Sequence, residues 1–400
     1  MSGIWSIPRR ASNADAALAV GELPGRLAEI SSQQKTSLLL HFVDASGRLH
    51  AWLFDQSGLV ASGATDGPYA GLGRVRSAMR VDSRAATRAP QPRRGPPLPP
   101  PPPAPPSSPV GDELARAAAQ LFPGQVGSAL SAGGGRLLVL SAWDTGAAPL
   151  AALPLAGETR LVDRWSTLVL PDLWALLDKG RSFDIRNLRL ANALVVGDPD
   201  LSGDPEYRWQ PLPAARAEAV EVGEMLQLEQ PRLLLGAQAT RTAVLEHLGR
   251  AEGPDLIYMA THGLANSVNP MDGSFLGLAG GHLYGRDLRS RRFEHWSYRH
   301  PLVVLSACQS ALGRTFEGGA YGLARAWISA GAAQVVASLW NVDDEATRLL
   351  MTRFTDKLWI GMTPEEALRS AQRHASTIYK DDPGAWASFS VMGVPATRRA

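Results

Sequence analysis

The chain has 400 residues, of which 45% are hydrophobic and 20% are charged. These proportions are typical of globular domains and exclude a chain that is disordered throughout. The formal net charge is +2 and no long block of either sign occurs, which argues against a nucleic-acid-binding face. Cys308 is the only cysteine, which excludes an intramolecular disulfide, a zinc ribbon and an iron–sulfur site built on several thiolates.

Neither a membrane span nor a secretion signal is expected. No stretch approaches the roughly 18–20 apolar residues that cross a bilayer. Near the N-terminus, Arg9 and Arg10 precede the apolar run Ala14–Val20. Asp15 interrupts that run and Glu22 closes it, which makes a poor signal peptide. We therefore expect a soluble, cytoplasmic protein in which the free thiol stays reduced.

The first predicted elements form a small antiparallel meander. Ser37–Val43 is apolar, and Arg48–Phe54 alternates between apolar and polar residues, as a half-buried strand does. Ser-Gly pairs at 46–47 and 57–58 predict the turns that follow these strands. The N-terminal part is thus divided into an extension, residues 1–35, and a small β-meander subdomain, residues 36–86.

A proline-rich segment separates the meander from the rest of the chain. More than half of the residues in Pro90–Pro109 are proline, including the run Pro99–Pro103. Proline lacks the amide hydrogen and fixes φ, so this segment suits neither a helix nor a sheet interior and should be extended. We assign residues 87–110 to a linker or insertion that acts as a spacer. The alternative is a docking peptide for an aromatic groove on a partner.

Residues 111–397 are assigned to the main domain. From about residue 190 its short apolar strands alternate with helices, which is typical of a parallel sheet covered on both faces. Thr240 is a suitable N-cap for one helix, and Thr363-Pro364-Glu365-Glu366 opens another with a cap, a first-turn proline and acidic residues. The expected strands are Arg136–Ser141, Ala193–Val196, Leu256–Ala260, Leu302–Ser306 and Gln334–Leu339. The other expected helices are Gly71–Arg80, Asp112–Leu121, Ala214–Leu226, Gly319–Ala330 and Asp343–Trp359.

Two of these strands end in residues suited to nucleophilic catalysis. Leu256–Ala260 runs into Thr261-His262-Gly263, and Leu302–Ser306 runs into Ala307 and Cys308. Ligands of an open parallel sheet bind at the carboxyl ends of its strands, so His262 and Cys308 would meet there if the two strands are neighbours. The imidazole would generate the attacking thiolate, and the Gly263 and Cys308 amides would form an oxyanion hole. On position alone, Cys308 is equally well explained as a small core residue.

Three stretches around these residues carry a family resemblance: Tyr258-Met-Ala-Thr-His-Gly263, Val304-Leu-Ser-Ala-Cys-Gln-Ser310 and Ser338-Leu-Trp-Asn-Val-Asp-Asp-Glu-Ala346. In this order they resemble the CHAT family, which comprises caspase-fold, separase-like cysteine proteases. His262 precedes Cys308 by 46 residues, close to the spacing in caspases. The resemblance spans residues 36–86 and 111–394, and further matching stretches are Leu194–Pro199, Pro211–Glu218, Gly331–Ser338 and Leu349–Phe354.

The resemblance implies an α/β fold, a caspase-like three-layer sandwich with a mostly parallel central sheet, to which the meander adds a small N-terminal β subdomain. It also implies a cysteine endopeptidase in which Cys308 is the nucleophile and His262 the base, without a cofactor. Caspases have glycine two residues after the cysteine, where this chain has Ser310, and this weakens a true-caspase assignment more than the protease assignment.

Family members are often kept inactive until a sensor or partner triggers them, and they often cleave one dedicated protein in prokaryotic stress, immune or cell-death pathways. No sensor repeats are recognisable in this chain, so we expect activation in trans by another protein. The competing hypothesis is a caspase-like interaction module that binds partners through Pro90–Pro109, with little or no proteolysis. A third possibility is that the chain cleaves only itself.

In separase-like enzymes, the segment after the strand that follows the nucleophile helps to wall the pocket for the residue before the scissile bond. Here that segment is Leu339–Glu345. Asp343 or Asp344 would accept a basic side chain there, and cleavage after Arg or Lys is the resulting hypothesis. The alternative is that both carboxylates stabilise the start of a helix. Trp340 is either a wall of the pocket or a core aromatic.

The 280–300 region holds His282, His295 and His300 among several arginines. A metal site would need ligands at tighter and more regular spacing, so no metal is expected. We predict a solvated loop near the active site that is able to gate the cleft.

Overall fold

The computed structural model describes residues 23–81, 91–93, 109–142, 144–177, 183–228, 232–266, 268–307, 315–316, 319–320, 322–340 and 343–397. The strands are β1 Ser37–Val43, β2 Arg48–Asp55, β3 Gly58–Pro68, β4 Gln91–Pro92, β5 Gly135–Leu140, β6 Trp165–Leu170, β7 Phe183–Asp184, β8 Ala193–Gly197, β9 Tyr207–Arg208, β10 Leu233–Leu235, β11 Leu256–Thr261, β12 Gly263–Leu264, β13 Phe275–Leu278, β14 Gly281–Tyr284, β15 Leu302–Ala307, β16 Thr315–Phe316, β17 Gly319–Ala320, β18 Gln334–Ser338, β19 Phe389–Gly393 and β20 Ala396–Thr397. The helices are α1 Leu23–Gln34, α2 Gly73–Val81, α3 Val110–Leu121, α4 Val126–Ala132, α5 Leu161–Arg164, α6 Trp174–Leu177, α7 Pro213–Met225, α8 Arg241–Leu248, α9 Trp296–Arg299, α10 Leu323–Ala330, α11 Asp344–Trp359, α12 Pro364–Ile378 and α13 Pro383–Trp386.

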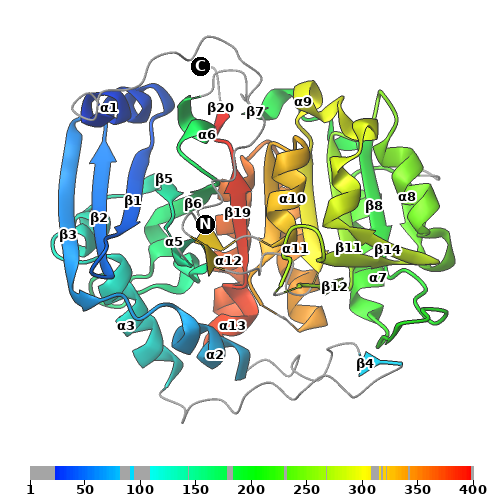
Figure 1. The fold of residues 1–400 in the computed structure, drawn as a ribbon, viewed down its shortest axis with the longest axis horizontal. Coiled ribbons are helices and arrows are strands. Elements are labelled where there is room, and N and C mark those ends of the chain that lie inside the picture. The colour runs from blue at the N-terminus through cyan, green and yellow to red at the C-terminus, as the bar shows by residue number, and fades with distance from the viewer. Residues whose placement is uncertain are drawn as a thin grey trace.

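Within the described residues, one sheet of 11 strands runs through the whole molecule in the order β10-β8-β11-β15-β18-β19-β6-β5-β1-β2-β3 (Figure 1). Neighbouring strands are parallel from β10 to β18 and again from β19 to β1. The antiparallel neighbours are β18 with β19, β1 with β2, and β2 with β3. The last two pairs are joined by tight turns, which can only connect antiparallel strands. The mostly parallel sheet predicted from the sequence is confirmed.

Helices cover both faces of this sheet. Successive residues of β18 point to opposite faces, as in any strand. Val335 and Ala337 face Ala324 of α10, whereas Ser338 lines a pocket with Ala215 of α7 and Thr347 of α11. On that second face, α11 packs against both α7 and α12. The three-layer α/β architecture is therefore confirmed, and His262 directly follows β11, in the β10–β18 half of the sheet.

The local predictions are confirmed for every expected strand, with shifts of one or two residues at the ends. One helix is wrong at its start: Gly319–Ala330 was expected, but Gly319–Ala320 forms β17, paired with β16, and α10 begins at Leu323. Gly322 precedes α10 with φ −102° and ψ −141°, a non-helical conformation, and glycine favours helices least among residues other than proline. The sequence also left β6, β13, β14 and β19 unassigned.

The N-terminal meander is continuous with the large sheet. Strand β1 pairs in parallel with β5, with Leu38 opposite Leu138, so β1–β3 extend one edge of the same sheet. Figure 1 shows these strands on the left, at the opposite end from β8 and α8.

The expectation of a solvated loop over residues 280–300 is wrong. Residues 275–284 form the β13–β14 hairpin, and the side chains of Phe293 and Trp296 are buried. The Trp296 ring stacks on that of Trp327 in α10, at 5.5 Å between centroids and 12° between planes. His282 and His295 are also buried. The apolar residues between the arginines anchor this segment to the sheet, and their burial outweighs the local excess of charge.

Of the proline-rich segment, the structure describes Gln91–Arg93 and Pro109; its other residues lie outside the described part of the chain. Gln91–Pro92 forms β4, which pairs antiparallel with β9. Among the helices of the described residues, none combines the length and the apolar character that crossing a bilayer requires.

Candidate active site

The strands that precede His262 and Cys308 are neighbours. Strands β11 and β15 pair in parallel, and their register places Thr261 opposite Ala307. His262 and Cys308 are the residues that directly follow this pair in the sequence. Cys308 lies outside the described residues, whereas His262 and Gly263 are described. The condition on which the sequence argument depends, that the two strands are neighbours, is therefore met.

The His262 side chain is buried and held from one side by a loop, Leu201–Gln210, which we call the 201–210 loop. The imidazole Nε2 lies 2.6 Å from the carbonyl oxygen of Gln210. Since a carbonyl oxygen can only accept a hydrogen bond, Nε2 is the nitrogen that carries the proton. The ring of Trp209 packs on the imidazole, with 4.8 Å between centroids and 40° between planes. The loop therefore determines both the tautomer and the orientation of His262.

A buried carboxylate holds Trp209 in place. The Trp209 indole N–H donates to the Asp204 carboxylate, which also pairs with His282 Nε2 at 3.3 Å. Burial alone would raise the pKa of Asp204, but the hydrogen bonds from Trp209 and from backbone amides lower it below its ordinary value. Burial lowers the pKa of His282, against the attraction of Asp204. The Asp204–His282 pair therefore ties the 201–210 loop to the β13–β14 hairpin, within which the His282 ring stacks on Phe275 at 4.1 Å.

Gly263 begins β12, which pairs antiparallel with β13. Gly263 lies opposite Leu276, and the Gly277 amide donates to the His262 carbonyl at 2.8 Å. This pattern makes Gly263 and Leu276 a non-hydrogen-bonded pair, so the Gly263 N–H points away from β13. The amide is thus not used by this ladder, as an oxyanion donor requires.

A pocket lies beneath this edge of the sheet, under the strand ends that precede His262 and Cys308. Its lining residues come from the four strands β11, β15, β18 and β19, from α7 with the residue before it, and from α11: Leu212, Ala215, Glu218, Thr261, Ser306, Ala307, Ser338, Asp344, Thr347 and Phe389. Glu218 is 1% exposed and accepts a hydrogen bond from the Tyr258 hydroxyl at 2.7 Å. Burial raises the pKa of Glu218 to about 7, although the hydroxyls of Ser306 and Tyr258 oppose the shift. An acid that is half protonated near neutral pH therefore lines the pocket under the ends of β11 and β15.

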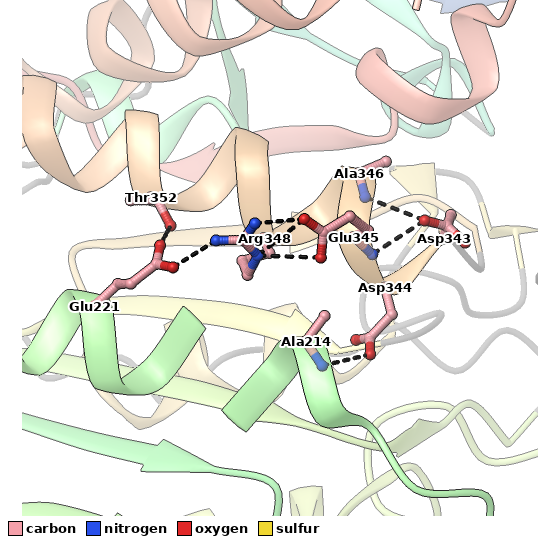
Figure 2. A network of polar contacts seen from close by, with 8 residues as sticks. All are labelled: Ala214, Glu221, Asp343, Asp344, Glu345, Ala346, Arg348 and Thr352. Atoms are coloured by element: carbon pink, nitrogen blue, oxygen red, sulfur yellow. Dashed lines mark hydrogen bonds and ion pairs between the residues drawn. The ribbon is translucent and has the colours of Figure 1, made fainter. Parts of the chain in front are cut away.

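The two acidic candidates for a substrate pocket have different partners (Figure 2). The Asp343 carboxylate caps α11, accepting from the amides of Glu345 at 3.0 Å and Ala346 at 3.2 Å. The Asp344 carboxylate accepts from the Ala214 amide of α7 at 2.9 Å and lines the pocket. Trp340 is fully buried in the core, and its indole N–H donates to the Gly384 carbonyl at 2.9 Å.

Arg348 fixes α7 and α11 relative to each other. Its guanidinium forms ion pairs with Glu345 in the preceding turn and with Glu221 of α7 (Figure 2). The Thr352 hydroxyl adds a hydrogen bond to Glu221 at 3.0 Å. This network joins the two helices that carry Glu218 and Asp344, both of which line the pocket.

No group of three or more His, Cys, Asp or Glu side chains suited to a metal ion occurs within the described residues. The sequence predictions did not identify Asp204, Trp209 and Gln210, the residues that hold His262. The available signal was an aromatic pair, Tyr207 and Trp209, in an otherwise polar loop. That signal does not say which histidine, more than 50 positions further on, the loop contacts.

Residues 112–394 match the sequence profile of the CHAT domain. Tetratricopeptide repeat protein 28 from mouse is 29% identical over 237 residues, which cover 50% of this chain and 9% of the mouse protein. The human protein of the same name is 27% identical over 273 residues, 58% of this chain and 11% of its own length. The chain thus spans about a tenth of these relatives.

Among solved structures, the Arg-specific cysteine proteinase gingipain R is similar with a TM-score of 0.43 and 11% identity, over 65% of this chain and 63% of gingipain. The separase–securin complex from Saccharomyces cerevisiae has a TM-score of 0.41 and 12% identity, over 66% of this chain and 16% of that chain.

Proposed function

Because the chain belongs to the CHAT domain family, we propose that it is a cysteine endopeptidase in which Cys308 and His262 form a catalytic dyad. The observation that carries this proposal is the register of β11 and β15, in which Thr261 lies opposite Ala307. His262 is the residue after Thr261, and Cys308 is the residue after Ala307. A second observation supports it: His262 is held by a carbonyl oxygen through Nε2, as a general base with a defined tautomer would be.

The proposed reaction uses the chain's own groups. His262 Nδ1 takes the thiol proton of Cys308, whose sulfur attacks the carbonyl carbon of the scissile peptide bond. The Gly263 and Cys308 amides donate to the oxyanion of the tetrahedral intermediate. His262 then gives its proton to the leaving amine as the C–N bond breaks and a thioester remains. Water, deprotonated by His262, hydrolyses the thioester, and the proton returns to the thiolate.

We further propose a protein substrate, cleaved after Arg or Lys, and activation by another protein in trans. Asp344 supports the basic preference, because it lines the pocket under the ends of β11 and β15, the strands that His262 and Cys308 follow in the sequence. Asp343 and Trp340 remain alternative contributors, although the one caps α11 and the other is buried in the core. A peptide-library cleavage profile tests this preference: Asp344→Asn should weaken selection for a basic residue, and an apolar preference of the unaltered protein would contradict the proposal.

An irreversible thiol-directed peptide probe tests the dyad. The unaltered protein should be labelled, Cys308→Ala should not, and His262→Ala should be labelled at least tenfold more slowly, since general base catalysis contributes about 10²–10⁴-fold. His374→Ala, an exposed histidine of α12, is the matched control and should be labelled normally. Equal labelling of the His262→Ala and His374→Ala proteins would contradict the dyad.

The competing interaction module predicts a different phenotype. If Cys308→Ala keeps full function in the producing cell, binding rather than proteolysis is the role of the chain. Loss of function in Cys308→Ala, with normal folding, supports the peptidase.

A further inference from the structure

A short strand from the proline-rich segment lies on the loop that holds His262. Strand β4 pairs antiparallel with β9, with Gln91 opposite Arg208 and Pro92 opposite Tyr207. In Figure 1, β4 lies at the lower right, far from α2, the preceding element in the sequence. In the sequence, nine residues separate Val81, the last residue of α2, from Gln91.

Arg93 anchors this strand through both its backbone and its side chain. Its amide donates to the Glu206 carbonyl at 2.7 Å. Its guanidinium donates through Nε to the Tyr207 carbonyl at 3.1 Å and through a terminal nitrogen to the Ser202 carbonyl at 2.9 Å. The three acceptors belong to one loop, and the fork of the guanidinium spans two of them, which a lysine ammonium would match poorly.

The charge of the loop suits an arginine. Glu206 is exposed on it, Asp200 is exposed directly before it, and Asp204 is a buried residue of the loop. Backbone hydrogen bonds of a β-bridge select an extended peptide, and the carbonyl pair with its acidic surroundings selects an arginine in that peptide.

We propose that the backbone edge of the 201–210 loop is a binding site for an extended, arginine-bearing peptide strand, occupied in this chain by Gln91–Arg93. A partner protein that presents such a strand would compete for the same edge. The consequence for catalysis rests on the proposed function: the residues directly after β9 are Trp209 and Gln210, which orient His262. Occupation of the edge holds this loop in the arrangement that positions the imidazole.

The docked strand is held weakly enough to be exchanged. It is short, and its hydrogen bonds are exposed to water, where each stabilises by only about 0.5–1.5 kcal/mol. Tethering at both ends compensates, because a short linker gives an effective concentration in the millimolar range. The chain's own Gln91–Arg93 therefore occupies the site, and a strand from another protein is still able to displace it.

Disulfide trapping tests the docking without any need for catalytic activity. The Cys308→Ala protein contains no cysteine, so a pair introduced by Gln91→Cys and Arg208→Cys reports on one contact. Cα atoms of antiparallel partners lie about 4.5–5.5 Å apart, within the range that a disulfide bridges. We expect this pair to oxidise readily, and a control pair of Gln91→Cys with Glu246→Cys, at an exposed position of α8, to remain reduced. Equal oxidation of both pairs would overturn the docking.

Two further experiments test whether the site requires an arginine. Adding Arg93→Ala should slow the 91–208 cross-link about tenfold, the factor expected for the loss of two exposed hydrogen bonds, whereas Arg74→Ala, an exposed arginine of α2, should not. A synthetic peptide with the sequence of residues 88–97 should also slow the cross-link, and the same peptide with alanine for Arg93 should not. If neither the substitution nor the peptide alters the rate, the arginine-specific site is disproved.

The coupling to His262 has its own readout. In the protein with Cys308 intact, Arg93→Ala should lower the rate of labelling by the thiol-directed probe and change its pH profile relative to Arg74→Ala. Normal labelling of Arg93→Ala, together with a slower cross-link, would leave the docking site intact and overturn the coupling. Absence of labelling in the unaltered protein would instead count against the dyad.

Discussion

The indole ring of Trp209 lies against the imidazole of His262, at 4.8 Å between ring centroids and 40° between ring planes. The two residues belong to separate segments of the chain, the 201–210 loop and the end of β11. Their contact explains why the loop needs the buried Asp204, which accepts the Trp209 N–H and prevents the indole from turning away. An aromatic face also attracts a cationic ring, so this packing favours the imidazolium formed during the proposed reaction.

The Trp209 contact predicts a graded effect on reactivity. Trp209→Ala should slow labelling of Cys308 by the thiol-directed probe about tenfold, because a desolvated cation–π contact contributes about 1–2 kcal/mol. Trp209→Phe should keep most of the rate, since a ring still covers the imidazole. Trp359→Ala, a half-exposed tryptophan of α11, is the control. Equal rates for the two alanine variants would contradict a role of Trp209 in positioning His262.

Asp204 is expected to act through Trp209. Asp204→Asn keeps the size of the side chain but removes the charge that pairs with His282 and accepts the indole N–H. The effects of substitutions within one hydrogen-bond network are not additive. The Asp204→Asn/Trp209→Ala double variant should therefore be labelled scarcely more slowly than Trp209→Ala alone. Labelling rates of the four proteins in this cycle measure the coupling. Fully additive effects would show that Asp204 acts on another part of the site.

Glu218 predicts a loss of stability as the pH rises. Burial raises its pKa from 4.5 to about 7, so the folded state binds a proton that the unfolded state releases. The stability due to this proton is complete below pH 4.5 and is lost as the pH rises to about 7, by about 3 kcal/mol. Glu218→Gln removes the ionisation but still accepts from Tyr258, so chemical unfolding at pH 8 should show a more stable variant. A variant less stable than the unaltered protein at pH 8 would contradict a buried charge at this position.

The pKa of His41 predicts the opposite pH dependence, a free energy of unfolding that falls as the pH falls. Burial lowers its pKa from 6.5 to about 4, against the hydrogen bond with the Leu121 carbonyl. The folded state therefore resists protonation, and its stability is complete above pH 6.5 and falls by about 3 kcal/mol toward pH 4. Since Glu218 and His41 oppose each other between pH 4.5 and 6.5, Glu218→Gln should expose an acid sensitivity that the unaltered protein masks. Adding His41→Leu should remove this sensitivity, and unfolding free energies at pH 4.5, 5.5 and 6.5 measure it.

Gly197 marks the closest approach of α7 to the sheet. A Cβ at this position would lie 2.3 Å from the Cβ of Ala219, where a real contact does not occur. Gly197→Ala should therefore force α7 outward and destabilise the protein by about 1–3 kcal/mol, the usual effect of overpacking. Gly203→Ala is the matched control, because its added Cβ would meet nothing within 4 Å. If the Gly197→Ala protein is as stable as the Gly203→Ala protein, α7 is able to move away from the sheet at little cost, and the pocket that α7 lines would change with it.

Much of the fold was predictable because its causes are local. The alternation of Arg48–Phe54, the apolar run Leu302–Ser306 and the cap at Thr363 act within a few residues, and the corresponding elements are present. The wrong start of α10 and the unassigned β13–β14 hairpin have a different origin. Glycines there have weak local preferences, and the hairpin is stabilised by burial of its own Leu276 and Leu283 in a core built from distant parts of the chain.

The sequence by itself determined that two strand ends carry a histidine and a cysteine, because a strand's apolar run and the residue that follows it are adjacent in the chain. The tertiary structure decided that those strands are neighbours in register, since strand order follows from packing of the whole sheet. It also decided that Trp209 and Gln210 hold His262, and that Gln91–Arg93 lies on their loop. These contacts join segments tens to more than a hundred residues apart, and no local pattern specifies the partner of a hydrogen bond or a ring over such a separation.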